Sequence, residues 1–179
     1  MVNKSVAAAA ALLVAAAPLS ATAEPEAAPV AAPADVASID AVMTAVYEVI
    51  SGPAGAPRDW DRFVSLFHED ARLIPYASAA PGGAQALSPT GYVERAQTAF
   101  QENGFFEVEI GRRVELYGDI AHAFSAYEAR RNEDDAEPFL RGVNSFQLIR
   151  HEGAWRVMTI FWQAETPDNP VPEDLIGAK

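Results

Sequence analysis

The last third of the chain has the pattern of a long β-hairpin, and this hairpin constrains the fold more than any other feature. Two strand-like runs, 139–149 and 155–165, are joined by a turn centred on Glu152 and Gly153. A short turn of this kind places the two strands side by side in an antiparallel sheet. The predicted register pairs Arg150 with Trp155, Leu148 with Val157, Phe146 with Thr159, and Asn144 with Phe161.

One face of this predicted hairpin mixes apolar and polar side chains. It carries Phe146, Leu148, Trp155, Val157 and Phe161, with Asn144, Thr159 and Gln163 among them. Because buried polar groups need partners, such a face indicates a pocket more than a sealed core. We therefore take Asn144, Thr159 and Gln163 as candidate ligand contacts, with Phe161 and Trp60 as an apolar wall. The alternatives are backbone hydrogen bonds for Asn144 and Gln163, an ordinary β-branched strand residue for Thr159, and plain core packing for Trp60 and Phe161.

Helical patterns dominate the part of the chain that precedes the sheet. Ser38, Asp59 and Ser88 are each placed to cap a helix, and Pro89 fits the first helical position. A short strand is predicted over 71–76. Period-two alternation then predicts strands from Phe106 to Leu116 and from Ile120 to Arg131. The order of elements predicts an α+β cone, in which three N-terminal helices pack on the concave face of a curved antiparallel sheet.

The N-terminal residues predict export from the cytoplasm. An apolar run over 6–17 precedes Ala21-Thr22-Ala23, which has the small-x-small pattern of a signal-peptidase site with cleavage after Ala23. We therefore expect a signal peptide over 1–23 and a periplasmic or secreted protein. Residues 24–36 are rich in Ala and Pro and predict a disordered linker. A single domain is expected over 37–172, with a short tail over 173–179.

The charge of the chain limits its partners. The formal net charge is −12, which argues against nucleic acid and against an anionic membrane surface. No later segment is long and apolar enough to span a membrane, so no membrane association is expected after signal cleavage. The chain has no cysteine, and its three histidines do not form a spaced ligand set. We expect no metal and no cofactor.

Three long segments resemble a known superfamily. Residues 51–67, 105–130 and 138–165, the last containing Gly-x-Trp-Arg-Val, are similar to secreted bacterial members of the nuclear transport factor 2-like superfamily, which includes SnoaL-like and ketosteroid isomerase-like proteins. The resemblance implies a cone-shaped fold, a pocket between sheet and helices, and frequent homodimers. The superfamily hosts isomerases, dehydratases, cyclases, epoxide hydrolases and binding domains, so the fold does not decide the function.

Arg112 and Tyr127 are the leading candidates on the strands before the hairpin. A two-residue turn at 118–119 places Arg112 opposite Ser125, on the apolar face. An arginine there needs an anionic ligand or an internal partner, such as Asp59 or Asp61. Tyr127 would donate a hydrogen bond to an oxyanion, or else pack in the core.

The same register places two glutamates on the charged, outward face. It sets Glu107 opposite Arg130, Glu109 opposite Glu128, and Ile110 opposite Tyr127. A one-residue bulge at Gly111 would exchange these faces. Glu128 and Asp59 then remain, with Tyr127, as weak catalytic candidates.

Three hypotheses follow from these residues. The first is a protein that binds a small apolar or amphipathic molecule. The second is a cofactor-independent lyase or isomerase that acts on such a molecule. The third is a non-catalytic homodimeric module, with Arg141, Gln147 and Trp162 on its outward face. A carboxyl group with a strongly raised pKa inside the pocket would favour the enzyme.

Overall fold

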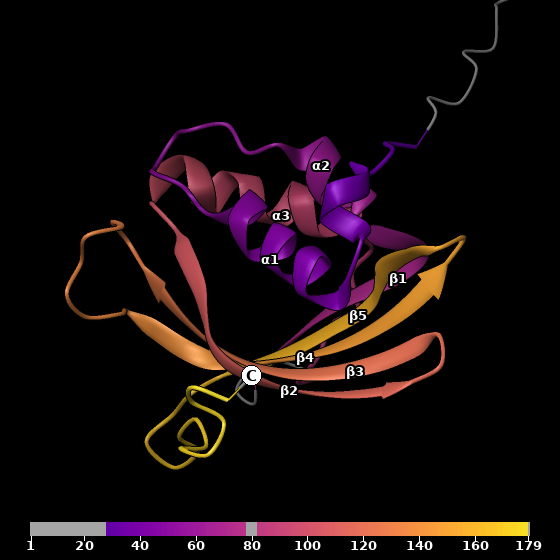
Figure 1. The fold of residues 1–179 in the computed structure, drawn as a ribbon. Helices are drawn as coiled ribbons and strands as arrows, with labels where there is room; N and C mark the ends of the chain where they lie inside the picture. The colour runs from indigo at the N-terminus through magenta and orange to yellow at the C-terminus, as the bar shows by residue number, and fades with distance from the viewer. Residues whose placement is uncertain (1–27, 78–81, 179) are drawn as a thin grey trace, which may run out of the picture.

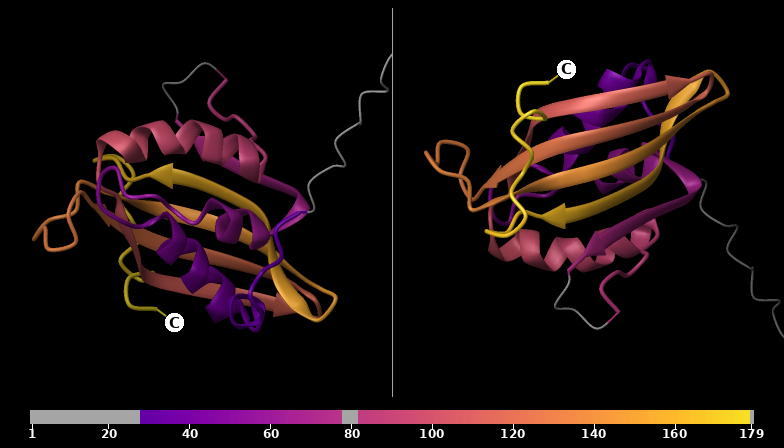
Figure 2. Two further views of the ribbon diagram at one scale, coloured as in Figure 1. Left: turned by 90° about the horizontal axis from the view of Figure 1, so that it is seen from above. Right: turned by 90° about the horizontal axis from the view of Figure 1, so that it is seen from below.

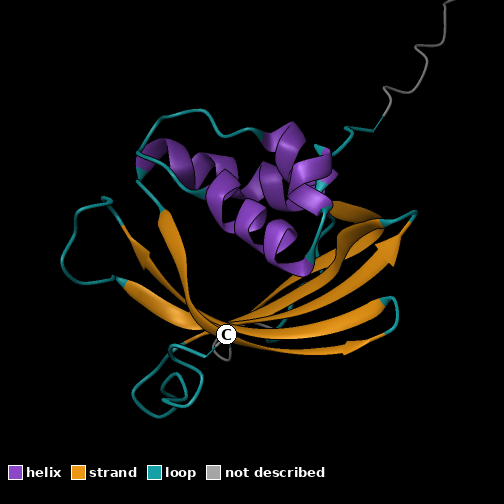
Figure 3. Ribbon diagram, viewed as in Figure 1, coloured by secondary structure: helices purple, strands orange, loops and turns teal. Residues whose placement is uncertain are grey.

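The structure, a computed structural model, describes residues 28–77 and 82–178 (Figure 1). The predicted signal peptide and the first residues of the predicted linker lie outside the described residues. Within the described part, a curved sheet lies beneath a layer of helices (Figure 3). The predicted α+β class is therefore confirmed. No helix in this part of the chain has the length and hydropathy needed to cross a membrane.

The sheet has five strands in the order β1-β5-β4-β3-β2. Its strands are β1 Phe67–Tyr76, β2 Phe106–Tyr117, β3 Ile120–Arg130, β4 Leu140–His151 and β5 Ala154–Ala164. The last four are antiparallel neighbours, whereas β1 pairs with β5 in parallel. The predicted hairpin is thus present. The strand predicted over 71–76 is present as the longer β1, but it pairs in parallel with β5, whereas the sequence predicted an antiparallel sheet.

The helices lie on the concave side of the sheet (Figures 1 and 2). They are the 3-10 helix η1 Pro33–Val36 and the α-helices α1 Ile39–Ile50, α2 Trp60–Ser65 and α3 Pro89–Glu102. The side chains of Ser38, Asp59 and Ser88 accept hydrogen bonds from the first turns of α1, α2 and α3, as predicted. These caps fix where each helix begins.

The end of the predicted linker is ordered, which corrects the expectation for residues 24–36. Val36 of η1 is buried, and the carboxylate of Asp35 pairs with Arg62 of α2 at 2.8 Å. The Arg62 guanidinium lowers the pKa of Asp35. The Ala- and Pro-rich composition gave no sign of this ordered turn. The buried side chain of Val36 and the ion pair of Asp35 are enough to hold it against the core.

Two bulges set the faces of the strands. In β2, Glu109 pairs with Tyr127 and Gly111 with Ala126, so Ile110 is an extra residue. The predicted register holds from Arg112 to Tyr117 and is wrong for Ile110, which was placed opposite Tyr127, and for the residues before it. Each bulge reverses the face of every residue beyond it, because side chains alternate with a period of two.

The second bulge lies in the hairpin. Leu148 pairs with Val157 as predicted, but Gln147 pairs with Thr159, which leaves Met158 as the extra residue of β5. The predicted register is therefore wrong beyond Val157. Asn144 pairs with Trp162, so Trp162 lies on the concave side and does not share an outward face with Arg141 and Gln147. The homodimer remains a prediction.

The C-terminal segment crosses the convex face of the sheet (Figure 2). Leu175 is fully buried there and packs with Ala126 and Val171. The backbone N–H of Gly177 donates to the carbonyl of Ile110, and that of Arg112 donates to the carbonyl of Ala178, each at 2.8 Å. The tail therefore satisfies the backbone groups that the β2 bulge exposes.

We predict that Gly111→Ala destabilises the protein by about 1–3 kcal/mol. A methyl group at Gly111 would overlap the carbonyl oxygen of Leu175 and would lie 2.7 Å from the nitrogen of Gly177. Urea unfolding of the wild type and the variant measures the difference. In a chain that ends at Pro172, the same substitution should cost little. An equal cost in both chains would show that the clash with the tail is not the cause.

Candidate functional site: a cavity between helices and sheet

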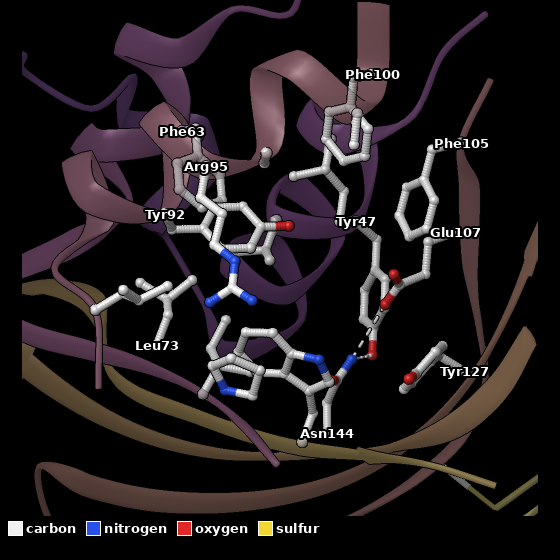
Figure 4. Close-up of a pocket in the computed structure, with 18 of the residues that line it drawn as sticks. Tyr47, Phe63, Leu73, Tyr92, Arg95, Phe100, Phe105, Glu107, Tyr127 and Asn144 are labelled. Atoms are coloured by element: carbon white, nitrogen blue, oxygen red, sulfur yellow. Dashed lines mark hydrogen bonds between the residues drawn. The ribbon is translucent and has the colours of Figure 1, made fainter. Parts of the chain in front are cut away.

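A cavity of about 360 Å³ lies between the helices and the concave face of the sheet (Figure 4). Its walls are mostly apolar and aromatic. Phe63, Phe100, Phe105, Phe146, Ile160 and Trp162 contribute to them. Its size is at the lower end of the range for small-molecule sites, which is roughly 300–1,000 Å³. A cavity thus lies between the sheet and the helices, where the resemblance implied a pocket, and ligand binding in it remains a prediction.

Among the described residues that line this cavity, the acidic one is Glu107 of β2. Its Oε1 accepts a hydrogen bond from Nδ2 of Asn144 at 3.2 Å, and it forms no ion pair in the part of the chain that the structure describes. Burial raises the pKa of Glu107 to about 7, although the Asn144 hydrogen bond opposes this shift. The carboxyl group therefore exchanges a proton near neutral pH.

The backbone around Glu107 is attached to the end of α1. Ser51, the C-cap residue of α1, accepts a hydrogen bond from the N–H of Glu107 at 3.0 Å. The Ser51 hydroxyl donates to the carbonyl of Tyr47 at 2.7 Å. Next to it, Gly52 and Phe105 exchange two backbone hydrogen bonds. The edge strand is thus fixed to the helix that forms one wall of the cavity.

A chain of hydrogen bonds runs from Glu107 into the interior. Asn144 Nδ2 also contacts the hydroxyl of Tyr47 at 3.0 Å, and that hydroxyl lies 2.7 Å from Ser125 Oγ. Ser125 in turn donates to Glu109 Oε1 at 2.5 Å. Because Ser125 has one hydrogen and gives it to a carboxylate, it accepts from Tyr47, and Tyr47 accepts from Asn144. The chain fixes the amide so that its NH₂ group faces Glu107.

Two tyrosine hydroxyls reach the cavity near Glu107. Tyr127 of β3 is only 2% exposed, and Tyr92 projects from α3. Neither hydroxyl has a hydrogen-bond partner among residues 28–77 and 82–178. Burial, reinforced by the charge of Glu107, raises the pKa of both tyrosines. Both therefore stay protonated at neutral pH and offer a hydrogen-bond donor to a ligand.

Of the seven ligand contacts predicted from the sequence, Tyr127 and Asn144 line this cavity, and the other five lie elsewhere. Beyond the hairpin bulge, Thr159, Phe161 and Gln163 occupy the opposite face, where Phe161 is 45% exposed. Phe161 and Gln163 line a smaller hollow beside the C-terminal tail. Trp60 stacks on Phe100 at a ring distance of 5.9 Å, outside the cavity.

Arg112 has an internal partner. Its guanidinium pairs with Glu109 at 3.2 Å and with Asp40 of α1. An internal ion pair was one of the two alternatives for this residue, although the partners differ from Asp59 and Asp61. Because Glu109 also accepts from Ser125, Arg112 binds the end of the hydrogen-bond chain that is farthest from Glu107.

The weak catalytic candidates Glu128 and Asp59 also have partners within the protein. Glu128 pairs with Arg130 at 2.5 Å, and Asp59 caps α2. Both lie outside the cavity. Within residues 28–77 and 82–178, no three histidine, aspartate or glutamate side chains are grouped closely enough to hold a metal ion.

Sequence reasoning missed Glu107, Glu109 and Tyr47. The alternating pattern without a bulge assigns both glutamates to solvent, and Tyr47 lies in a helix pattern that gave no reason to single it out. The available signal was Gly111, a glycine inside a strand, which marks a possible bulge and would exchange the faces.

Comparisons with known proteins identify the fold. No family model matches the chain, and no curated protein matches it. A protein of unknown function from Silicibacter pomeroyi, described as nuclear transport factor 2-like, is 18% identical, with 71% of this chain and 92% of that chain covered and a TM-score of 0.51. A second such protein, from Pseudomonas putida, is 15% identical, with 76% and 92% covered and a TM-score of 0.56. A proposed ketosteroid isomerase from Parabacteroides distasonis is 11% identical, with 72% and 88% covered and a TM-score of 0.51.

We predict that the contribution of Glu107 to the stability of the protein falls as pH rises from about 4.5 to about 7. Burial raises the pKa of Glu107 from 4.5 to about 7, so over this range the folded state binds a proton that the unfolded state has lost. The loss is about 3 kcal/mol. Glu107→Gln should remove this component and be more stable than the wild type at about pH 8.

Chemical denaturation at several pH values measures this difference. Glu115→Gln, an exposed change on the same strand, is the matched control and should keep the wild-type pH dependence. Parallel pH profiles for the wild type and Glu107→Gln would contradict the raised pKa.

Proposed function

We propose that this chain, which has the nuclear transport factor 2-like fold, is a periplasmic or secreted protein that binds a small, largely apolar molecule and moves a proton on it. The reaction class is that of a cofactor-independent isomerase or lyase. The observation that carries the proposal is Glu107, a carboxyl group with a pKa of about 7 at the wall of an apolar cavity. A general base works best when its pKa is close to the working pH.

The proposed first step removes a proton from a carbon next to a carbonyl group. The Glu107 carboxylate takes the proton, the electrons of the C–H bond form a carbon–carbon double bond, and the π electrons of the carbonyl group move to its oxygen, which gives an enolate. The hydroxyl of Tyr127 donates a hydrogen bond to that oxygen. Because Tyr127 is buried and stays protonated, it is organised for this role before the substrate binds.

The second step decides between the two reaction classes. In an isomerase, Glu107 returns its proton to a different carbon of the enolate. In a lyase, the enolate electrons form a double bond between the α- and β-carbons as the bond from the β-carbon to an oxygen leaving group breaks, and Glu107 gives its proton to that oxygen. Both steps need only one carboxyl group that is stable in either protonation state.

The hydrogen bond from Asn144 favours the ionised state of Glu107. It stabilises the carboxylate and opposes the rise in pKa that burial causes. Without a donor at this position, the carboxyl group would remain protonated at neutral pH and would be a poor base. The Asn144 amide therefore keeps the pKa of Glu107 near neutral pH, where a general base works best.

Binding without turnover is the second candidate. It is supported by the mainly apolar and aromatic walls, which offer contact area for a ligand whatever its chemistry. It predicts that ligands enter the cavity and leave unchanged.

We predict that the protein accelerates exchange of the α-hydrogens of 2-tetralone, an apolar bicyclic ketone, with solvent deuterium. Proton NMR measures the rate. Glu107→Gln should lower the catalysed rate by at least about 100-fold, and Tyr127→Phe by about 100-fold, because each removes a group used in the first step. The rate should rise with pH, with a midpoint near 7.

Glu115→Gln is again the control and should exchange like the wild type. Equal rates in the wild type and Glu107→Gln would refute the role of Glu107 as base. If 2-tetralone binds to the wild type without exchange, binding without turnover is the better conclusion.

A further inference from the structure

A single cationic side chain is directed into the cavity from the described part of the chain. Arg95 lies in the middle of α3, and its guanidinium points between the aromatic walls (Figure 4). Arg95 and Glu107 are the charged groups among the lining residues that the structure describes. They enter from different elements, one from the helical layer and one from the edge of the sheet.

The guanidinium has little compensation from the protein. Its hydrogen bond goes to Oε1 of Gln85, a neutral acceptor, at 3.0 Å. It forms no ion pair with any residue in 28–77 or 82–178, and the same holds for arginines 58, 72, 131 and 156, whereas arginines 62, 112, 113, 130, 141 and 150 form them. Of these five arginines without an ion pair, Arg95 is the one that lines the cavity.

The surroundings of Arg95 favour an anionic ligand. The Arg95 side chain is exposed, so water partly screens its charge, and it acts on a ligand as a solvated cation beside an apolar cavity. A planar guanidinium also offers paired N–H donors that match a carboxylate. The net charge of −12 repels anions from the rest of the molecule, so a local cation is needed to hold one.

We infer that the molecule bound in this cavity is a small organic anion, with an apolar body, whose carboxylate or similar group pairs with Arg95 while its reactive end faces Glu107. This inference rests on the proposed function, because it names the substrate class of the same cavity. The ionised form of Glu107 would repel the anionic end of such a ligand. That repulsion and the attraction of Arg95 orient the ligand in the same direction.

Two fluorescent probes test the inference. 8-Anilinonaphthalene-1-sulfonate is an anion, and N-phenyl-1-naphthylamine is the neutral molecule with the same aromatic body. Fluorescence titration at low salt measures both dissociation constants. Arg95→Gln should weaken the sulfonate by about threefold to tenfold, as expected for a partly exposed ion pair, and should leave the neutral probe unchanged. High salt should reduce the difference.

Three variants serve as controls. Arg95→Lys retains the charge and should recover part of the sulfonate affinity. Arg113→Gln removes an exposed charge at another site and should change neither probe. Ala96→Trp fills the cavity from α3 and should weaken both probes.

The outcomes separate the two claims. If the neutral probe binds in the cavity and the ratio of the two affinities is the same in Arg95→Gln as in the wild type, the anionic substrate class is wrong and the proposed function stands. If neither probe binds to the wild type, or if Ala96→Trp retains both, the cavity is not a small-molecule site and both claims fall.

Discussion

The extra residue in β2 determines which side chains enter the cavity. With Ile110 as a bulge, Glu107 and Glu109 turn to the concave face, and Arg112 remains on that face to pair with Glu109. A regular strand would turn both glutamates outward. The bulge depends on residues far along the chain, because Gly177 and Ala178 satisfy its backbone groups and Leu175 packs against it. The C-terminal tail on the convex face thus supports the site on the concave face.

The two glutamates that the bulge turns inward differ in their partners, and this difference gives them different roles. Glu109 accepts from Ser125 and pairs with Arg112, so its negative charge is compensated. Glu107 has a hydrogen bond from a neutral amide, and burial raises its pKa to about 7. Pairs of carboxyl groups whose surroundings differ in this way are a common basis for acid–base function. Glu109 anchors the hydrogen-bond chain, which holds Asn144 against Glu107.

Much of the fold follows from local patterns. The caps at Ser38, Asp59 and Ser88, the final hairpin and its register near the turn all depend on nearby residues. The faces of the strands do not, because each bulge is decided by packing against distant parts of the chain. One extra residue in β5 moved Phe161 out of the cavity, and one in β2 moved Glu107 into it. Tyr127 and Asn144 were found because each lies on the strand without the extra residue, where the deduced face was correct.

The central claim is that Glu107 is a partly buried carboxyl group at the wall of the cavity that titrates near neutral pH. It is tested most directly by a carbon-13 NMR titration of the glutamate side-chain carboxyl groups, with the Glu107 signal assigned by its absence from Glu107→Gln. We predict a midpoint of about 7 for that signal. A midpoint near the ordinary value of about 4.5 would contradict the claim, because the carboxyl group would then be solvated or paired with a cation, and would be a poor base at neutral pH.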